Sequence, residues 1–119
     1  MPKSYADLTT EARARVKEVT PADVKRMRER GEEVAVVDVR EDREWNLGHV
    51  QGAMHMSRGT LEGKIERSVP RDRPVVLYCA SGNRSLLAAE SLQQMGYVNV
   101  SSMSGGFRGW VDAGGDVEG

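Results

Sequence analysis

The sequence predicts an α/β fold in which helices flank a central, mainly parallel sheet. Two short, continuous runs of β-branched and other apolar residues, Val34–Val39 and Pro74–Tyr78, are typical of strands that are buried on both faces. Segments with helical periodicity alternate with these runs along the chain. Strands that alternate with helices favour parallel pairing, with helices on both faces of the sheet.

The length and composition indicate one globular domain. The chain has 119 residues, of which 39% are hydrophobic and 29% charged, and its formal net charge is −1. The balanced charge excludes a nucleic acid or an anionic membrane as the main partner. No apolar stretch is long enough to cross a bilayer, and the first residues lack the apolar core of a signal peptide, so we expect a cytoplasmic protein.

The few cysteines and histidines limit the chemistry that the chain can use. A single cysteine, Cys79, excludes an intrachain disulfide. The two histidines, His49 and His55, lack metal-ligand spacing with Cys79, so we expect neither a metal ion nor another cofactor. We expect His49 to fix a turn by hydrogen bonds rather than to act as an acid or base, and the role of His55 stays open.

The first part of the chain predicts two helices. Apolar residues recur at every fourth position over residues 7–19, which predicts an amphipathic helix. A Thr-Pro pair at 20–21 provides a cap and a first-turn proline for a second helix, which runs to about residue 30. We therefore divide the chain into an N-terminal helical extension, residues 1–19, and a main domain, residues 20–119.

Periodicity and turn residues predict the remaining elements. A third main strand is expected over residues 98–103, and the tail, residues 114–119, is expected to fray. Residues 48–53 contain turn-forming glycines and predict a turn with extended chain. Further helices are expected over residues 40–46, 61–67, 85–95 and 107–111.

Cys79 directly follows the second buried strand. A lone cysteine in a cytosolic chain is by default a small buried hydrophobe. Three features favour a nucleophile instead. Cys79 lies at the carboxyl end of a strand, where open α/β sheets place their ligands. Gly82 and Asn83 permit a nest of inward-facing amides, and a helix that begins near Ser85 directs its positive end to the same point.

These features favour the thiolate form of Cys79. An unperturbed cysteine thiol is only about 3% ionised at pH 7. The helix end and the positive charge of Arg84 both stabilise a negative sulfur. We therefore predict a nucleophile in a cup of amide donors, which would hold a sulfur anion or the oxyanion of a substrate.

The length of the loop separates sulfur transfer from phosphoryl transfer. The four residues Ala80 to Asn83 lie between Cys79 and Arg84, whereas cysteine phosphatases place one more residue there. A phosphoryl group needs room for several oxygens and an arginine fork, while the terminal sulfur of a persulfide is one atom. The shorter loop therefore favours sulfur.

Several segments, taken in order, resemble a known family. The segments are Asp38–Glu41, Gly48–Ala53, Tyr78–Ser85, Met95–Tyr97 and Gly105–Trp110. Their order and spacing are similar to those of a single-domain rhodanese, a thiosulfate sulfurtransferase-like protein. The resemblance extends over about residues 20–113.

The resemblance implies a rhodanese-like three-layer sandwich for residues 20–119, with Asp38 and Arg40 as structural supports. It implies that Cys79 takes a sulfane sulfur from thiosulfate or a similar donor as a persulfide and passes it to cyanide or a thiol. Because the chain has no second cysteine, that acceptor would be external. The implied substrate-binding residues are those of the loop: Ala80, Ser81, Gly82, Asn83, Arg84 and Ser85.

Two other functions stay open on the sequence alone. The same loop fits a binding module that receives or hands over sulfur with a protein partner. It also fits a cysteine phosphatase or arsenate reductase, which the short loop disfavours. Arg84 could bind substrate, or could bridge the loop to Asp38 and Glu41. Arg58 could draw anions to the mouth of the site, or could be a solvated surface arginine.

Overall fold

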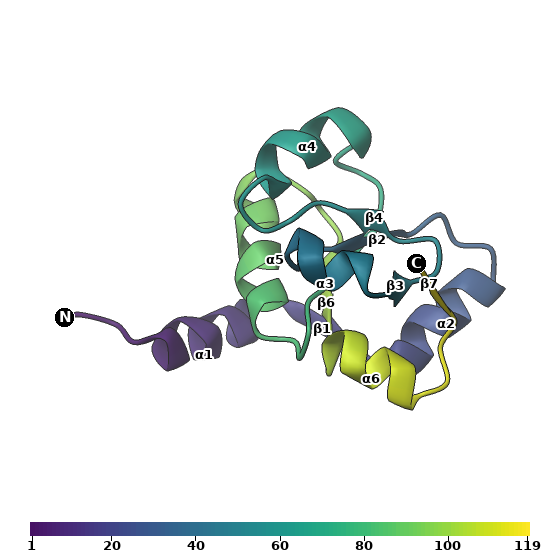
Figure 1. Cartoon of the computed structure of the whole chain (residues 1–119). Helices are drawn as coiled ribbons and strands as arrows, with labels where there is room; N and C mark the ends of the chain where they lie inside the picture. The colour runs from purple at the N-terminus through teal and green to yellow at the C-terminus, as the bar shows by residue number, and fades with distance from the viewer.

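The computed structural model describes residues 1–119 and contains a five-stranded sheet in which every neighbouring pair is parallel (Figure 1). The strand order is β1-β6-β5-β2-β4. A separate two-stranded antiparallel sheet pairs β3 with β7. The strands are β1 (Lys17–Val19), β2 (Ala35–Asp38), β3 (His49–Val50), β4 (Met54–His55), β5 (Val75–Tyr78), β6 (Val100–Met103) and β7 (Val117–Glu118).

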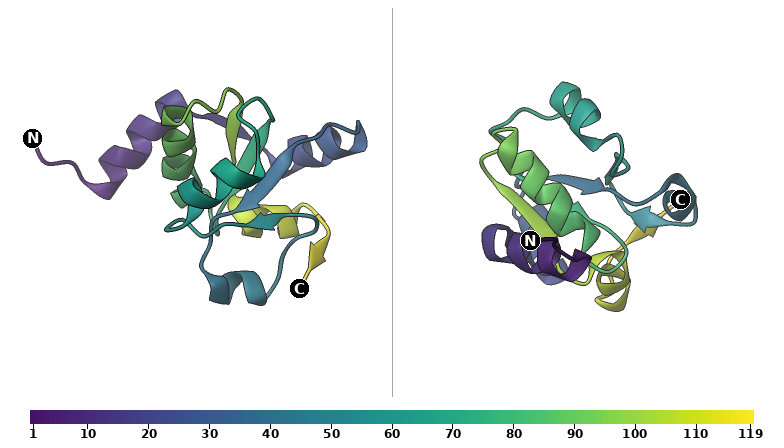
Figure 2. Two further views of the ribbon diagram at one scale, coloured as in Figure 1. Left: turned by 90° about the horizontal axis from the view of Figure 1, so that it is seen from above. Right: turned by 90° about the vertical axis from the view of Figure 1, so that its left-hand side faces the viewer.

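Helices cover both faces of the five-stranded sheet (Figures 1 and 2). They are α1 (Tyr5–Arg15), α2 (Pro21–Glu29), α3 (Asp42–Asn46), α4 (Leu61–Ser68), α5 (Arg84–Gln94) and α6 (Gly106–Asp112). Helices α1, α4 and α5 pack on one face, and α2 and α6 pack on the other. The α/β class with a parallel central sheet is therefore confirmed. None of the helices combines the length and the apolar composition needed to cross a membrane.

The side chains of β2 and β5 point alternately into two cores, which explains why the sequences of these strands are continuously apolar. Val37 and Leu77 contribute to the core beneath α4 and α5, whereas Val36, Val76 and Tyr78 contribute to the core beneath α2 and α6. Because successive side chains of a strand point to opposite faces, a strand with helices on both sides needs apolar residues at every position.

The structure corrects the predicted ends of the chain. The first helix ends at Arg15 rather than residue 19, and residues 17–19 form the edge strand β1, in parallel register with β6. The expected fraying of residues 114–119 is also wrong, since β7 pairs antiparallel with β3. Helix α1 packs against α5 through the fully buried Ala12. The division of the chain at residue 19 stays a prediction.

A buried ion pair fixes the segment after β2. The carboxylate of Asp38 accepts hydrogen bonds from the Arg40 guanidinium at 2.8 to 3.1 Å and from the Arg40 amide at 2.8 Å. Asp38 is fully buried, Arg40 is 5% exposed, and the Arg40 guanidinium also donates to the Gly48 carbonyl at 2.7 Å. The pair thereby ties the end of β2 to the turn before β3.

Helix α6 begins against the segment that follows β5. The amide of Phe107 donates to the Cys79 carbonyl at 2.8 Å, and the amide of Arg108 donates to the Ala80 carbonyl at 3.3 Å. Gly106, with φ +57°, directly precedes Phe107, and a Cβ at this position would lie only 2.3 Å from the Cys79 carbonyl oxygen. A glycine is required here because no side chain fits the contact.

We expect Gly106→Ala to destabilise the fold by roughly 2–4 kcal/mol, because the added methyl group would push the chain after β5 away from α6. Gly63→Ala is the matched control, since Gly63 is helical and has no atom near its added Cβ. That control should gain roughly 0.5–1 kcal/mol from the helix propensity of alanine. Urea unfolding measures both changes, and equal stabilities for the two variants would contradict the close contact.

We expect Asp38→Asn to cost roughly 3–5 kcal/mol, because it leaves the Arg40 guanidinium buried without its counter-charge. Glu11→Gln is the comparison, since Glu11 pairs with Lys3 on the surface, and its loss should change stability by less than about 1 kcal/mol. Denaturant midpoints for the two variants test the difference. A small effect at Asp38 would show that the interior pair contributes little.

Candidate active site

Cys79 is the first residue after β5 and opens the loop that leads into α5. Its side chain is 1% exposed. The Sγ atom accepts a hydrogen bond from the Gly82 amide at 3.1 Å and lies 3.5 Å from the hydroxyl oxygen of Ser85. The sequence correctly places the cysteine at the carboxyl end of a strand, but the sulfur is buried beneath its own loop.

The loop around Cys79 contains unused amide donors. Of the predicted cradle, the Gly82 amide is the one that contacts Sγ. The amides with no protein acceptor are those of Ala80, Ser81, Asn83, Arg84 and Ser85. Gly82 has φ +108°, a backbone angle that glycine adopts without strain. The loop therefore presents several free N–H groups that an anion could engage.

Two buried hydroxyl groups lie beneath the sulfur. Ser85 and Ser102 are fully buried, and their hydroxyl oxygens are 2.7 Å apart. The Ser85 hydroxyl also lies 3.3 Å from the Gly82 carbonyl, to which it can donate. Ser102 lies on β6, so this contact joins the loop to a neighbouring strand. Sequence reasoning missed Ser102, because nothing in its local sequence distinguishes it from other strand serines.

Arg84 bridges the loop to helix α3. Its guanidinium donates to the two carboxylate oxygens of Glu44 at 3.2 and 3.3 Å. The hydrogen bond to Glu44 is the main reason that the pKa of Arg84 rises above its ordinary value. Burial opposes ionisation of Glu44, but hydrogen bonds from Arg84 and from a backbone amide outweigh it and lower the pKa of Glu44. The bridge therefore exists, but its partner is Glu44 rather than Asp38 or Glu41.

Arg58 and the two histidines form their hydrogen bonds with residues other than Cys79. Arg58 pairs with Glu62 of α4 at 2.8 Å. His49 lies 3.0 Å from the Trp45 carbonyl through Nδ1, and His55 lies 2.9 Å from a backbone carbonyl through Nε2. Both imidazole rings stack on the Trp45 indole, with ring centroids 3.3 and 4.8 Å away. These contacts fit the expectation that His49 fixes a turn.

An open cleft of about 380 Å³ lies beside the loop. Ala80 and Ser81 form one side, and Phe107, Arg108 and Val111 of α6 form much of the other. On a different side of the loop, the Arg13 guanidinium of α1 donates to the side-chain carbonyl of Asn83 at 3.3 Å. Arg13 is thus a loop contact that the sequence did not reveal, and it places the N-terminal helix against the loop that Cys79 opens.

Comparisons with known proteins agree with this geometry. The sequence profile of the rhodanese-like domain family matches residues 20–113. The thiosulfate sulfurtransferase GlpE of Pseudomonas fluorescens is 34% identical over 94 residues, which cover 79% of this chain and 84% of that protein. The probable adenylyltransferase/sulfurtransferase MoeZ of Mycobacterium tuberculosis is 30% identical over 94 residues, which cover 78% of this chain and 24% of MoeZ. The chain therefore spans about a quarter of the length of MoeZ.

A solved structure from Rhodopseudomonas palustris superposes with a TM-score of 0.89 and 35% sequence identity, covering 99% of this chain and 96% of that one. That protein is described as of unknown function and as a possible tyrosine phosphatase. The family match covers most of the chain, including the loop that Cys79 opens. The resemblance drawn from the sequence is confirmed, and the chain belongs to the rhodanese-like domain family.

Proposed function

We propose that this protein is a sulfurtransferase that carries a sulfane sulfur on Cys79. The observation that supports this most directly is the environment of Sγ, which accepts a hydrogen bond from the Gly82 amide in a loop with further free amides. A sulfur anion is stabilised by such donors. The family match and the GlpE relative, a thiosulfate sulfurtransferase, support the same chemistry.

The proposed reaction has two displacement steps. In the first, the Cys79 thiolate attacks the outer sulfur of thiosulfate or a similar donor. A bond forms between the two sulfurs, the sulfur–sulfur bond of thiosulfate breaks, and its electron pair leaves with sulfite. In the second step, cyanide or a thiolate attacks the outer sulfur of the persulfide, and the Cys79 thiolate leaves.

The burial of Cys79 limits how a donor reaches it. A side chain that is 1% exposed cannot meet a donor while the loop stays in this conformation. The loop residues Ser81 and Asn83 are exposed, and Gly82 has the backbone freedom for a change of loop shape. We infer that the loop shifts outward to admit the donor and then closes over the persulfide.

A sulfur-relay role is the second candidate. MoeZ is about four times as long as the segment that matches this chain, so its related segment works within a larger protein. In a relay, a partner protein rather than a small thiol would discharge Cys79. Such a role would give persulfide formation at Cys79 but negligible turnover with cyanide.

A phosphatase is less well supported. The loop has four residues between Cys79 and Arg84, and the Arg84 fork that would bind phosphate oxygens is engaged by Glu44. The description of the Rhodopseudomonas palustris protein as a possible tyrosine phosphatase makes the comparison worth including as a control.

Treatment with thiosulfate should add one sulfur atom to the protein, detected by intact-protein mass spectrometry. Dithiothreitol should remove it, because a persulfide exchanges with thiols. Since Cys79 is the only cysteine, Cys79→Ser should show no such gain. A gain that persists in Cys79→Ser, or none in the unaltered protein, would rule out the proposed mechanism.

The same preparation separates the three candidate functions. Rapid loss of the added sulfur to cyanide indicates a sulfurtransferase that uses small acceptors. Retention in cyanide with loss to a protein fraction indicates a relay. Hydrolysis of an aryl phosphate that disappears in Cys79→Ser indicates a phosphatase and contradicts the proposal.

Replacement of Arg84 tests whether it binds the donor. If it does, Arg84→Gln should raise KM for thiosulfate about 10- to 100-fold, the loss expected for one charged hydrogen bond. Glu44→Gln should lower KM or leave it unchanged, because it frees the Arg84 guanidinium from its ion pair. Arg43→Gln, at an exposed position on α3, is the control. A similar rise in KM in the Arg84 and Glu44 variants would show that the ion pair only stabilises the conformation of the loop.

A further inference from the structure

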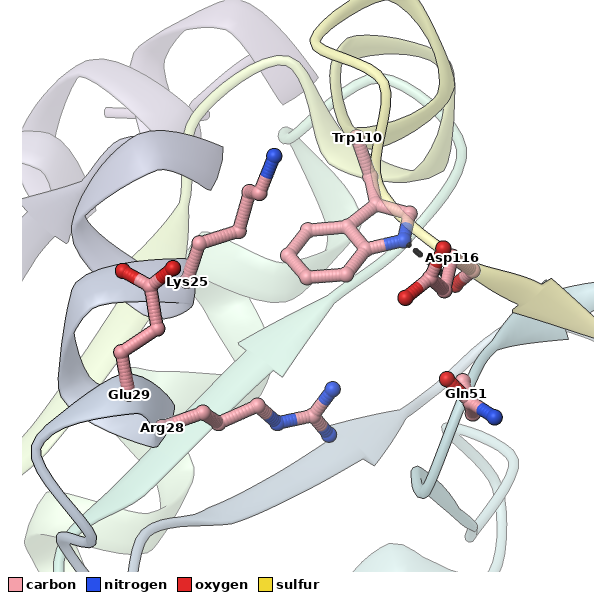
Figure 3. Close-up of a pocket in the computed structure, with 6 residues that line it drawn as sticks. All are labelled: Lys25, Arg28, Glu29, Gln51, Trp110 and Asp116. Atoms are coloured by element: carbon pink, nitrogen blue, oxygen red, sulfur yellow. Dashed lines mark hydrogen bonds between the residues drawn. The ribbon is translucent and has the colours of Figure 1, made fainter.

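A second cavity lies between α2, α6 and the loop before β7, with a volume of about 210 Å³ (Figure 3). Its lining residues are Lys25, Arg28, Glu29, Gln51, Trp110 and Asp116. None of them belongs to the Cys79 loop or to α5. Sites for drug-sized ligands usually measure roughly 300–1,000 Å³, so this cavity suits a smaller molecule.

Arg28 is the unusual residue of this cavity. The structure contains five arginines that are partly or fully buried, and four of them have hydrogen-bond partners: Arg40, Arg58, Arg73 and Arg84. Arg28 has none, although it too is partly buried. Burial lowers the pKa of Arg28 below its ordinary value. Its N–H donors have no acceptor within the chain, and they remain open to solvent at this concave site.

Trp110 borders the cavity but exposes almost none of its ring. Its side chain is nearly buried, and the Arg28 guanidinium lies 5.8 Å from the centre of its ring. The indole N–H donates to the Asp116 carbonyl at 2.8 Å, so the polar edge of the ring is already satisfied. The indole therefore helps to shape the cavity, but the charged groups provide its binding surface.

Asp116 faces the cavity from the side opposite Arg28 (Figure 3). Its backbone carbonyl is held by two donors, the Trp110 indole and the Gln51 amide at 3.0 Å, so the position of the residue is fixed. Its carboxylate forms no ion pair with Arg28. The Arg28 guanidinium and the Asp116 carboxylate thus lie on opposite sides of the cavity and do not form an ion pair.

A molecule that fills this gap must carry both charges. A carboxylate would satisfy the Arg28 fork in bidentate geometry. An ammonium group on the same molecule would satisfy Asp116. Lys25 and Glu29 add one charge of each sign to the same lining, so a simple anion would meet two carboxylates as well as two cations.

We propose that the cavity between Arg28 and Asp116 binds a small zwitterion, a free α-amino acid. The carboxylate lies on Arg28 and the amino group on Asp116. This site is separate from Cys79, and the proposal does not depend on the sulfurtransferase activity.

L-leucine is the probe, and the Trp110 indole N–H signal in an amide-proton NMR spectrum is the reporter. Trp45→Phe identifies which of the two indole signals belongs to Trp110. L-leucine should shift that signal in a saturable way. Its analogues 4-methylpentanoate, which lacks the amino group, and 3-methylbutylamine, which lacks the carboxylate, should each bind at least about tenfold more weakly.

Two variants test the residues independently. Arg28→Gln and Asp116→Asn should each weaken L-leucine binding roughly 10- to 100-fold. The second variant preserves the contacts that hold residue 116, because they use its backbone carbonyl. Arg67→Gln, an exposed arginine on α4, should leave binding unchanged.

Three results would overturn the proposal. One is the absence of any saturable shift with L-leucine. Another is binding of 4-methylpentanoate as tight as that of L-leucine, which would show that the cavity is a simple anion site. The third is unchanged L-leucine binding in both the Arg28 and the Asp116 variants.

Discussion

The contact between α6 and the backbone after β5 sets the shape of the candidate site. The carbonyls of Cys79 and Ala80 are held by amides of α6, and Gly106 allows the two segments to touch. In a planar trans peptide the C=O and the following N–H point in opposite directions. The amides of Ala80 and Ser81 must therefore point away from α6. The Cys79 side chain packs in the core beneath α4 and α5, so one contact both positions the cysteine and leaves amides after it free of protein acceptors.

The charges around the loop indicate that these amides stabilise a negative sulfur more than Arg84 does. The positive field of Arg84 at the sulfur is partly cancelled by Glu44, which lies within ion-pair distance of its guanidinium. The amide dipoles and the start of α5 have no such counter-charge, and the Gly82 amide donates directly to Sγ. Any stabilisation of a sulfur anion in this conformation therefore comes mainly from the backbone. Arg84 gains influence on a bound anion only when its pair with Glu44 loosens.

The sequence predicts those elements whose signal lies in neighbouring residues of the chain. Strands β2 and β5 are continuous apolar runs because both of their faces are buried, and Cys79 stands out by following one of them. The sequence pattern predicts a helix over residues 17–19, where the structure has strand β1. This strand has only three residues, two of them exposed, so its sequence shows no pattern of buried apolar residues. Strand β7 is equally short and exposed. The Arg84–Glu44 and Ser85–Ser102 contacts join residues far apart in the chain, and only the assembled sheet shows which of many polar residues meet.

The burial of Cys79 bears on which group it can carry. A persulfide adds a single sulfur to a side chain that is already almost inaccessible, in an interior packed as densely as a crystal. In the proposed mechanism, the outer sulfur would lie among the free loop amides, where hydrogen bonds would offset the loss of water around its charge. A tetrahedral phosphoryl group would require the loop to open much further and would need an arginine that Glu44 holds. In the proposed mechanism, the tight loop thus discriminates by size, and it shields the persulfide sulfur from solvent while it stays closed.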